Sequence, residues 1–259
     1  MKTNKKKLPK DQCIGVTEAG EIAFNLKSFR NLYKGNIIIT KRLTDELISL
    51  LVKHKEKIIL HLCVTGFGST RIEPFVPPME DTYKKFVQLL EQGFPINQVV
   101  LRVDPIVPSE RGGETAIKVL KRFSNMGIER VRLSFLDNYA HVKKRFEEEG
   151  IDVLYDGKFH APLYLRIKWL EKISDAAKEC GFTSVEVCGE PGIESIPCLS
   201  QKDIDILGLS DEVTLEGSSE QRSSCGCPKN KRELINSQKP PQRCENSCLY
   251  CYWRNGKKS

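Results

Sequence analysis

The chain has 259 residues, 39% of them hydrophobic and 29% charged, with ten cysteines and a formal net charge of +7. This composition is typical of a folded globular protein and excludes an intrinsically disordered one. No run approaches the roughly 18 apolar residues that span a bilayer, and no apolar stretch follows the basic residues 1–7. We therefore expect a cytoplasmic protein with no secretory signal and no membrane contact. In that reducing compartment, cysteines indicate free thiols or metal or cluster ligands rather than disulfides.

Short apolar runs alternate with amphipathic stretches along the chain, which is the pattern of an α/β protein. We predict strands over residues 13–16, 36–40, 58–64, 99–103, 130–134 and 184–188. We expect helices over residues 26–32, 43–55, 80–92, 115–125, 140–149 and 162–180, with a short helix at 201–207. Such strand–helix units form either a barrel or an open doubly wound sheet. Polar residues follow all six strands and no dinucleotide-binding fingerprint is present, which favours the barrel.

Positive charge is concentrated at the two ends of the chain. Residues 1–10 carry five lysines and no acid, and residues 229–259 carry eight Lys or Arg against two Glu. We divide the chain into a basic N-terminal tail (1–12), a (β/α) barrel (13–207) and a cysteine-rich tail (208–259) packed on the barrel. Basic ends suit a polyanionic partner such as nucleic acid. Solubilising tails explain the same pattern equally well.

Three cysteines near the end of the sequence form a C-x3-C-x2-C motif. They are Cys244, Cys248 and Cys251, and an aromatic residue, Tyr250, directly precedes the last of them. Three thiolates at this spacing can bind three irons of a [4Fe–4S] cluster, whose ligands are cysteine thiolates, and leave the fourth iron open to a small molecule. A zinc knuckle that uses part of the motif is the alternative.

The motif resembles that of radical S-adenosylmethionine (SAM) proteins, and CLYCY at residues 248–252 is most similar to the spore photoproduct lyase or DNA repair photolyase-like branch. The resemblance extends over most of the chain, through ITK at 39–41, VTGFG at 64–68, IEPFVPP at 72–78, LRVDPI at 101–106, LSFLDNY at 133–139, CGE at 188–190 and CGC at 225–227. It implies a TIM-like (β/α)6 partial barrel, a [4Fe–4S] cluster and SAM as cofactors, Tyr250 close to the adenine, and an electron donor such as a flavodoxin or ferredoxin.

The position of the motif departs from the radical SAM pattern. In those proteins the cysteine triad follows the first strand, whereas the corresponding residues 17–21 here contain no cysteine. If the resemblance holds, the C-terminal tail folds back over the mouth of the barrel.

Four further cysteines match the ligand count of a closed site. Cys188, Cys198, Cys225 and Cys227 could hold a second [4Fe–4S] cluster or a zinc ion, and ordinary thiols are the alternative. The three remaining cysteines, Cys13, Cys63 and Cys180, lie in strand or helix patterns and are expected to be small buried hydrophobes.

Other candidate site residues lie at the predicted strand ends. Arg102 and Asp104 alternate on one face of a strand, so both are predicted to point into the barrel and bind SAM or a substrate phosphate. Asp137 is placed with them as a catalytic candidate, although it could equally cap the following helix. His61 alternates with apolar neighbours and is predicted to be a satisfied core histidine.

The cofactor-binding candidates besides Tyr250 are two glycines and one acid. Gly66 and Gly68 form a Gly-rich turn whose N–H groups could hold a phosphate or the adenosine of SAM, or could serve only as a turn. Glu190, in CGE, is similar to the Gly-Gly-Glu segment that contacts the SAM amino group in the resembled family.

These observations predict a radical SAM enzyme of lyase- or isomerase-like chemistry that repairs or modifies a nucleic-acid base or nucleotide. Base chemistry in a duplex requires the base to be extruded, which would place it at the barrel mouth. The alternative is a non-catalytic nucleic-acid-binding protein whose cysteines bind zinc or an iron–sulfur cluster and stabilise the tail.

Overall fold

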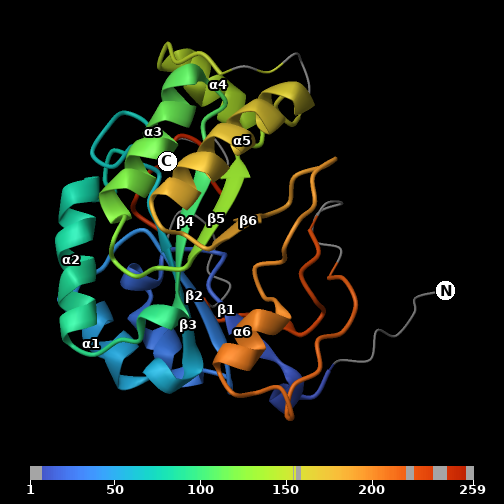
Figure 1. Cartoon of the computed structure of the whole chain (residues 1–259). Helices are drawn as coiled ribbons and strands as arrows, with labels where there is room; N and C mark the ends of the chain where they lie inside the picture. Colours follow the sequence, from blue (N-terminus) through green and yellow to red (C-terminus); the bar gives the residue numbers. More distant parts are fainter. Residues whose placement is uncertain (1–7, 154, 156–158, 220–224, 236–243, 255–259) are drawn as a thin grey trace.

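The centre of the molecule is a seven-stranded, fully parallel sheet (Figure 1). The computed structural model describes residues 8–153, 155, 159–219, 225–235 and 244–254. The strand order is β6-β5-β4-β3-β2-β1-β7. The strands are β1 (Ile14–Val16), β2 (Asn36–Thr40), β3 (Ile58–Cys63), β4 (Val99–Ile106), β5 (Arg130–Phe135), β6 (Ser184–Val187) and β7 (Lys231–Glu233).

Helices follow the strands in alternation, as the sequence predicts. The α-helices are α1 (Asp45–Lys53), α2 (Met79–Glu91), α3 (Glu110–Phe123), α4 (Ala140–Glu148), α5 (Leu163–Glu179) and α6 (Gln201–Ile206). Short 3-10 segments cover Lys10–Gln12, Ile22–Phe24, Leu26–Asn31, Lys55–Lys57 and Ile96–Gln98. Side-chain caps fix several helix starts: Thr44 accepts a hydrogen bond from Leu47 N–H, and Ser109 accepts one from Gly112 N–H.

The two faces of the sheet are covered differently. Alternate strand residues such as Ile38, Leu60, Leu101 and Val131 pack against α1, α2, α3 and α5 in the largest hydrophobic core. The opposite face carries a smaller core, in which Ile37, Ile59 and Val100 meet the segment around α6 through Leu199, Ile204 and Leu209. Figure 1 shows α1 and α2 along one side of the sheet and α6 on the other.

The α6-facing side of the sheet also buries a layer of charged side chains. Arg130 bonds both Glu186 and Asp203, each at 2.7 Å, and Arg132 pairs with the same Glu186. His61 lies beside these arginines, fully buried, and its two ring nitrogens have no hydrogen-bond partner among the described residues. The prediction that His61 is buried is confirmed. The prediction that it is satisfied is wrong, because its register neighbours on β2 and β4 are the apolar Ile39 and Val100, and no described group bonds either ring nitrogen.

The coarse fold prediction is confirmed: the protein is an α/β protein with a parallel sheet. The strand order is sequential from β1 to β6, without the reversal that defines a doubly wound sheet. No ladder joins β6 to β7 in the described part of the chain, so the structure shows an open sheet rather than a closed barrel. Its seventh strand comes from the predicted tail, which extends the sheet at the free edge of β1. No helix of the described chain is long and apolar enough to cross a membrane.

Candidate functional site

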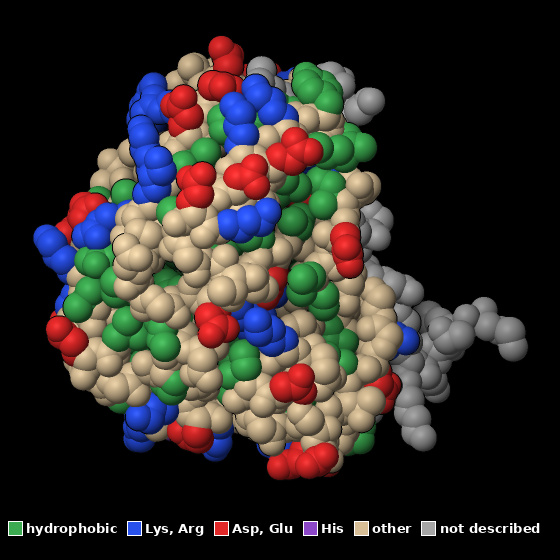
Figure 2. Space-filling model, viewed as in Figure 1, with side chains coloured by type: hydrophobic (Ala, Val, Ile, Leu, Met, Phe, Trp, Pro, Cys, Tyr) green, Lys and Arg blue, Asp and Glu red, His purple; other side chains and the backbone are tan. Residues whose placement is uncertain are grey.

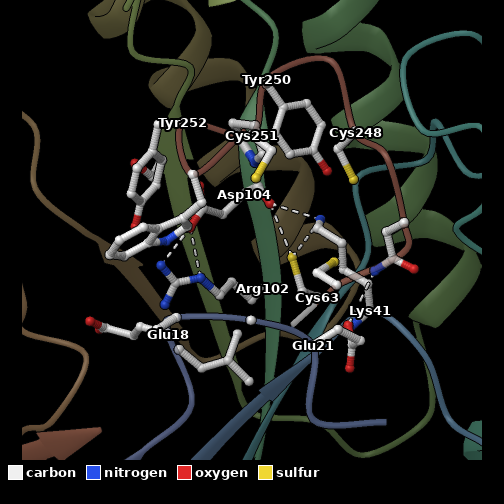
Figure 3. Close-up of a pocket in the computed structure, with 18 of the residues that line it drawn as sticks. Glu18, Glu21, Lys41, Cys63, Arg102, Asp104, Cys248, Tyr250, Cys251 and Tyr252 are labelled. Atoms are coloured by element: carbon white, nitrogen blue, oxygen red, sulfur yellow. Dashed lines mark hydrogen bonds and ion pairs between the residues drawn. The ribbon is translucent and has the colours of Figure 1, made fainter. Parts of the chain in front are cut away.

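A cavity of about 240 Å³ opens at the carboxyl ends of the strands (Figure 3). Parallel strands end at the same edge of a sheet, so residues that are distant in sequence converge there. The lining includes Glu18 and Glu21 after β1, Lys41 after β2, Cys63 at the end of β3, Arg102 and Asp104 in β4, Asp137 after β5, and Cys244, Cys248, Tyr250, Cys251, Tyr252 and Trp253 from the C-terminal segment. The described part of the C-terminal segment therefore lies over the strand ends.

The segment that carries the C-x3-C-x2-C motif is held by backbone and apolar contacts. Leu249 N–H donates to the Ile72 carbonyl at 2.9 Å, and Arg145 of α4 donates to the Cys251 carbonyl at 2.7 Å. Cys248, Leu249 and Tyr250 pack with apolar residues of the loop between β3 and α2 and of α4. Those contacts position Cys248 and Cys251 over the cavity.

The three motif thiols fit an iron–sulfur cluster. All three line the cavity, and Figure 3 shows the sulfur atoms of Cys248 and Cys251 pointing into it. Burial raises the pKa of Cys244 to about 11, and burial likewise raises the pKa of Cys248. Thiolates are therefore unfavourable here unless positive charge is added, which a bound metal cluster supplies. The donor set is three sulfurs beside open space, which suits a cluster with one free iron.

Lys41 is the central residue of the cavity wall. Its ammonium lies 3.1 Å from the Glu73 carboxylate, donates to Cys63 Sγ at 3.0 Å and to the Asp104 carbonyl at 3.2 Å, and sits 5.3 Å from the centre of the Tyr250 ring. Burial opposes the charge, but Cys63 and Glu73 outweigh it and raise the pKa of Lys41 above its usual value. Cys63 is buried as predicted, yet its neighbours are polar and it lines the cavity.

Glu73 and Glu21 connect Lys41 to the motif segment. Tyr250 donates its hydroxyl hydrogen bond to Glu73, which is also bonded by the Thr65 hydroxyl at 2.6 Å. Glu21 accepts from the Lys41 backbone N–H at 2.9 Å and from the Asn246 side chain at 3.4 Å. Burial raises the pKa of Glu21. Sequence reasoning assigned no role to Lys41, Glu73 or Glu21.

The predicted pair of Arg102 and Asp104 lies in the cavity wall. Arg102 Nε donates to Asp104 Oδ2 at 2.7 Å, and its Nη1 reaches Cys198 Sγ at 3.1 Å. Asp137 also lines the cavity, with its carboxylate 2.9 Å from His160 Nδ1. Arg102 therefore joins the cavity to the second group of cysteines.

The four cysteines of the second group lie together in the structure. Cys188, Cys198 and Cys227 are buried together, and the half-buried Cys225 packs against them. The Cys188 and Cys198 sulfur atoms are 3.3 Å apart, and neither cysteine is in a disulfide. Hydrogen bonds with Cys188 and Cys227, aided by Arg102, hold the pKa of Cys198 well below its usual value.

Three predicted cofactor-binding residues do not line this cavity. A side chain at Gly66 would meet Thr115 at 2.5 Å, and one at Gly68 would meet the Pro77 carbonyl at 2.0 Å, so both glycines permit close packing of the loop. Glu190 is buried and bonded to Phe135 N–H at 2.6 Å and to Arg166 at 3.0 Å. Its carboxylate therefore joins β5 to α5.

Aromatic side chains gather at the cavity mouth. Tyr139 stacks on Tyr252 with 5.5 Å between ring centres, and Tyr252 lies 5.2 Å from Trp253. Phe159 meets Tyr139 edge to face at 4.7 Å. Tyr252, Trp253 and Phe159 are exposed, so the mouth offers flat apolar surfaces to a ligand.

The basic ends belong largely to parts of the chain outside the described residues. Residues 1–7, 236–243 and 255–259 include most of the lysines and arginines that suggested a polyanionic partner. On the face shown in Figure 2, Lys and Arg side chains are interspersed with Asp and Glu.

A comparison with known protein families finds a match, and the matched range contains both cysteine groups. Residues 33–253 match the family described as Domain of unknown function (DUF1848). The chain belongs to this family. No curated protein matches the chain. The family description carries no activity, so the function has to be argued from the site.

Proposed function

We propose that this DUF1848 protein is a radical SAM enzyme. The observation that carries the proposal is that Cys244, Cys248 and Cys251 line one cavity at the carboxyl ends of a parallel sheet. If bound there, a [4Fe–4S] cluster and SAM would supply hydrogen-atom abstraction from the substrate, with the electron that cleaves SAM coming from the flavodoxin- or ferredoxin-type donor. The protein's own residues hold and orient these groups.

The roles of the protein residues follow from their contacts. The three motif thiols would bind three irons. Lys41 and Glu73 fix the motif segment through Tyr250, and the lysine places a buried positive charge beside the thiols. Tyr250 would then lie beside the adenine of SAM. These contacts hold the thiols in one geometry before any ligand binds, which is the main contribution that a protein makes to cofactor chemistry.

Arg102 and Asp104 are proposed to bind the polar parts of SAM or of the substrate. The guanidinium can donate to a carboxylate or phosphate, and Asp104, which is less buried, can accept from ribose hydroxyls. Asp137, held by His160, is the third proposed catalytic group on this wall.

We also propose that the open sheet is the wall of a (β/α)6 partial barrel. Two observations support this description: the order of β1 to β6 is sequential, and the cavity lies at their carboxyl ends, where barrel enzymes place their active sites. In this description β7 extends the wall beyond β1.

The proposed substrate is a nucleic-acid base or nucleotide. The exposed aromatic side chains Tyr252, Trp253 and Phe159 support it, because a base extruded from its strand can stack on such rings. Trp253 reports on this directly, since Trp169, the other tryptophan, is buried. A nucleotide or single-stranded oligonucleotide should quench the fluorescence of the wild type and leave Trp253→Phe unchanged. Equal quenching in both proteins would contradict stacking at the mouth.

The enzymatic test is cleavage of SAM. Protein purified without oxygen and reconstituted with iron and sulfide, given SAM and a reductant, should release 5′-deoxyadenosine and methionine. Cys248→Ala should abolish that product, and Cys180→Ala, a cysteine at the end of α5 outside the cavity lining, should retain it. A flavodoxin or ferredoxin should replace the chemical reductant. No 5′-deoxyadenosine from cluster-loaded wild type would reject the proposal and leave a non-catalytic nucleic-acid-binding protein.

A further inference from the structure

Four cysteines besides the C-x3-C-x2-C motif converge from three separate segments, and three of them, Cys188, Cys198 and Cys225, also line the cavity. Cys188 follows β6, Cys198 precedes α6, and Cys225 and Cys227 precede β7. The sulfur atoms of Cys188 and Cys198 are 3.3 Å apart, and those of Cys198 and Cys227 lie within 4.8 Å of each other. The Cys227 thiol is also in hydrogen-bonding contact with both Cys198 and Cys225. The four thiols therefore form a continuous group.

The 3.3 Å between the Cys188 and Cys198 sulfurs suits two ligands of one metal ion rather than two ligands of a cluster. Four thiolates at about 2.3 Å from a tetrahedral zinc ion lie about 3.8 Å from one another. In a [4Fe–4S] cluster each thiolate binds a different iron at the outside of the cube, so its sulfurs are spread more widely. We propose that Cys188, Cys198, Cys225 and Cys227 bind one zinc ion in a closed tetrahedral site.

The surroundings of the four thiols supply the partners that a zinc tetrathiolate needs. Such a site carries a net charge of −2, and its sulfurs accept N–H hydrogen bonds. Arg102 already donates to Cys198 at 3.1 Å. Arg132 is buried beside Cys188 and Cys198, and its Nε and Nη1 have no hydrogen-bond partner within the described chain. Buried unpaired donors are costly, and the negative charge of a nearby zinc tetrathiolate would offset part of that cost.

Glu18 is the competing fourth ligand, because its carboxylate lies within 4.8 Å of the Cys198 and Cys227 sulfurs. It also accepts a hydrogen bond from Lys231 at 2.7 Å, which keeps it in an ion pair between the loop after β1 and β7. Cys225 is the softer donor and belongs to the same Cys-x-Cys segment as Cys227. The proposal therefore assigns the fourth position to Cys225.

A zinc ion at this place joins three segments: the end of the edge strand β6, the loop before α6, and the segment that leads into β7. It is a structural site with no open position, and it does not depend on the proposed radical chemistry. Arg102 would connect the zinc thiolates to Asp104 in the cavity wall, because it contacts both Cys198 and Asp104.

The first test removes the other cysteine site. Full-length protein in which Cys244, Cys248 and Cys251 are all replaced by Ala should be colourless and contain one zinc ion per chain. X-ray absorption at the zinc edge should show four sulfur neighbours at about 2.3 Å. Absence of zinc, iron in its place, or nitrogen or oxygen neighbours would overturn the proposal. Iron content and 5′-deoxyadenosine formation of the wild type are measured separately, so failure of the radical proposal leaves this result unaffected.

The second test assigns the ligands in the same colourless background. Cys198→Ser and Cys225→Ser should each lower zinc affinity at least tenfold, whereas Cys180→Ser and Glu18→Gln should keep one zinc ion per chain. Loss of zinc in Glu18→Gln together with full retention in Cys225→Ser would overturn the four-thiolate assignment. Cobalt added to the metal-free protein provides a readout in a folded protein, since a tetrahedral cobalt tetrathiolate absorbs visible light.

Discussion

The ion pair between Lys41 and Glu73 gives the sharpest test of how the site is held together. The Glu73 side chain is 1% exposed and that of Lys41 is 15% exposed, with 3.1 Å between the charged atoms. Lys41→Met keeps the length of the side chain but leaves the carboxylate with only hydroxyl partners. Removing one member of a buried pair costs about 3–5 kcal/mol. In a protein of this size that loss lowers the unfolding temperature by roughly 6–20 °C.

The matched control is Lys85→Met, because Lys85 pairs with Asp45 at 2.6 Å on the surface, where the two side chains are 37% and 67% exposed. An exposed pair contributes about 0.2–1 kcal/mol. Thermal unfolding of the metal-free proteins, followed by circular dichroism, compares the two variants. Adding Glu73→Gln to Lys41→Met should recover part of the loss, because the unpaired charge is then gone. Equal shifts for Lys41→Met and Lys85→Met, or no recovery in the double variant, would refute the reasoning.

Two further predictions concern the sheet and the loop after β3. Burial opposes ionisation of Glu186, but Arg132 and Arg130 outweigh it and lower its pKa below the usual 4.5. The ionised Glu186 therefore contributes its full stabilisation above about pH 4.5, and this contribution is lost as the pH falls through the lowered pKa. When stability is measured against falling pH, Glu186→Gln should decline less steeply than the wild type over that range. An unchanged profile would contradict this. Gly68→Ala should cost about 1–3 kcal/mol in urea unfolding, because its Cβ would lie 2.0 Å from a carbonyl oxygen. Gly181→Ala meets open space and should cost less, through its φ of +87° alone; the reverse order would contradict the packing argument.

The regular elements could be predicted because their signals are local. The run Asn36–Thr40 is a strand with the predicted bounds, and α2 and α5 begin and end within one residue of the prediction. β7 (Lys231–Glu233) was missed because three polar residues show no alternation. It is a strand only because it pairs with β1, 217 residues earlier at Ile14 and Lys231, and no nearby sequence carries that information.

The site could be predicted where the spacing or the number of cysteines indicates the chemistry. The C-x3-C-x2-C motif and the count of four remaining cysteines each identified a group that the structure brings together. Lys41 was not recognisable, because a lysine after a strand is ordinarily solvated. It is largely shielded from solvent here since the motif segment packs across it and places Tyr250 over its ammonium. Gly68 was a candidate for ligand binding, but a glycine after a strand can allow close packing as readily as it can bind a ligand.

The pairing of β7 with β1 also has a consequence for the growing chain. β1 is complete at Val16, but the strand that covers its outer edge begins at Lys231. At 5–20 residues per second, ribosomes take roughly 10–40 s to synthesise the residues between them. During that time the outer edge of β1 has no β7 to pair with, and unpaired strand edges are sites of aggregation. β1 is only three residues long, which keeps that exposed edge small while the chain is being made.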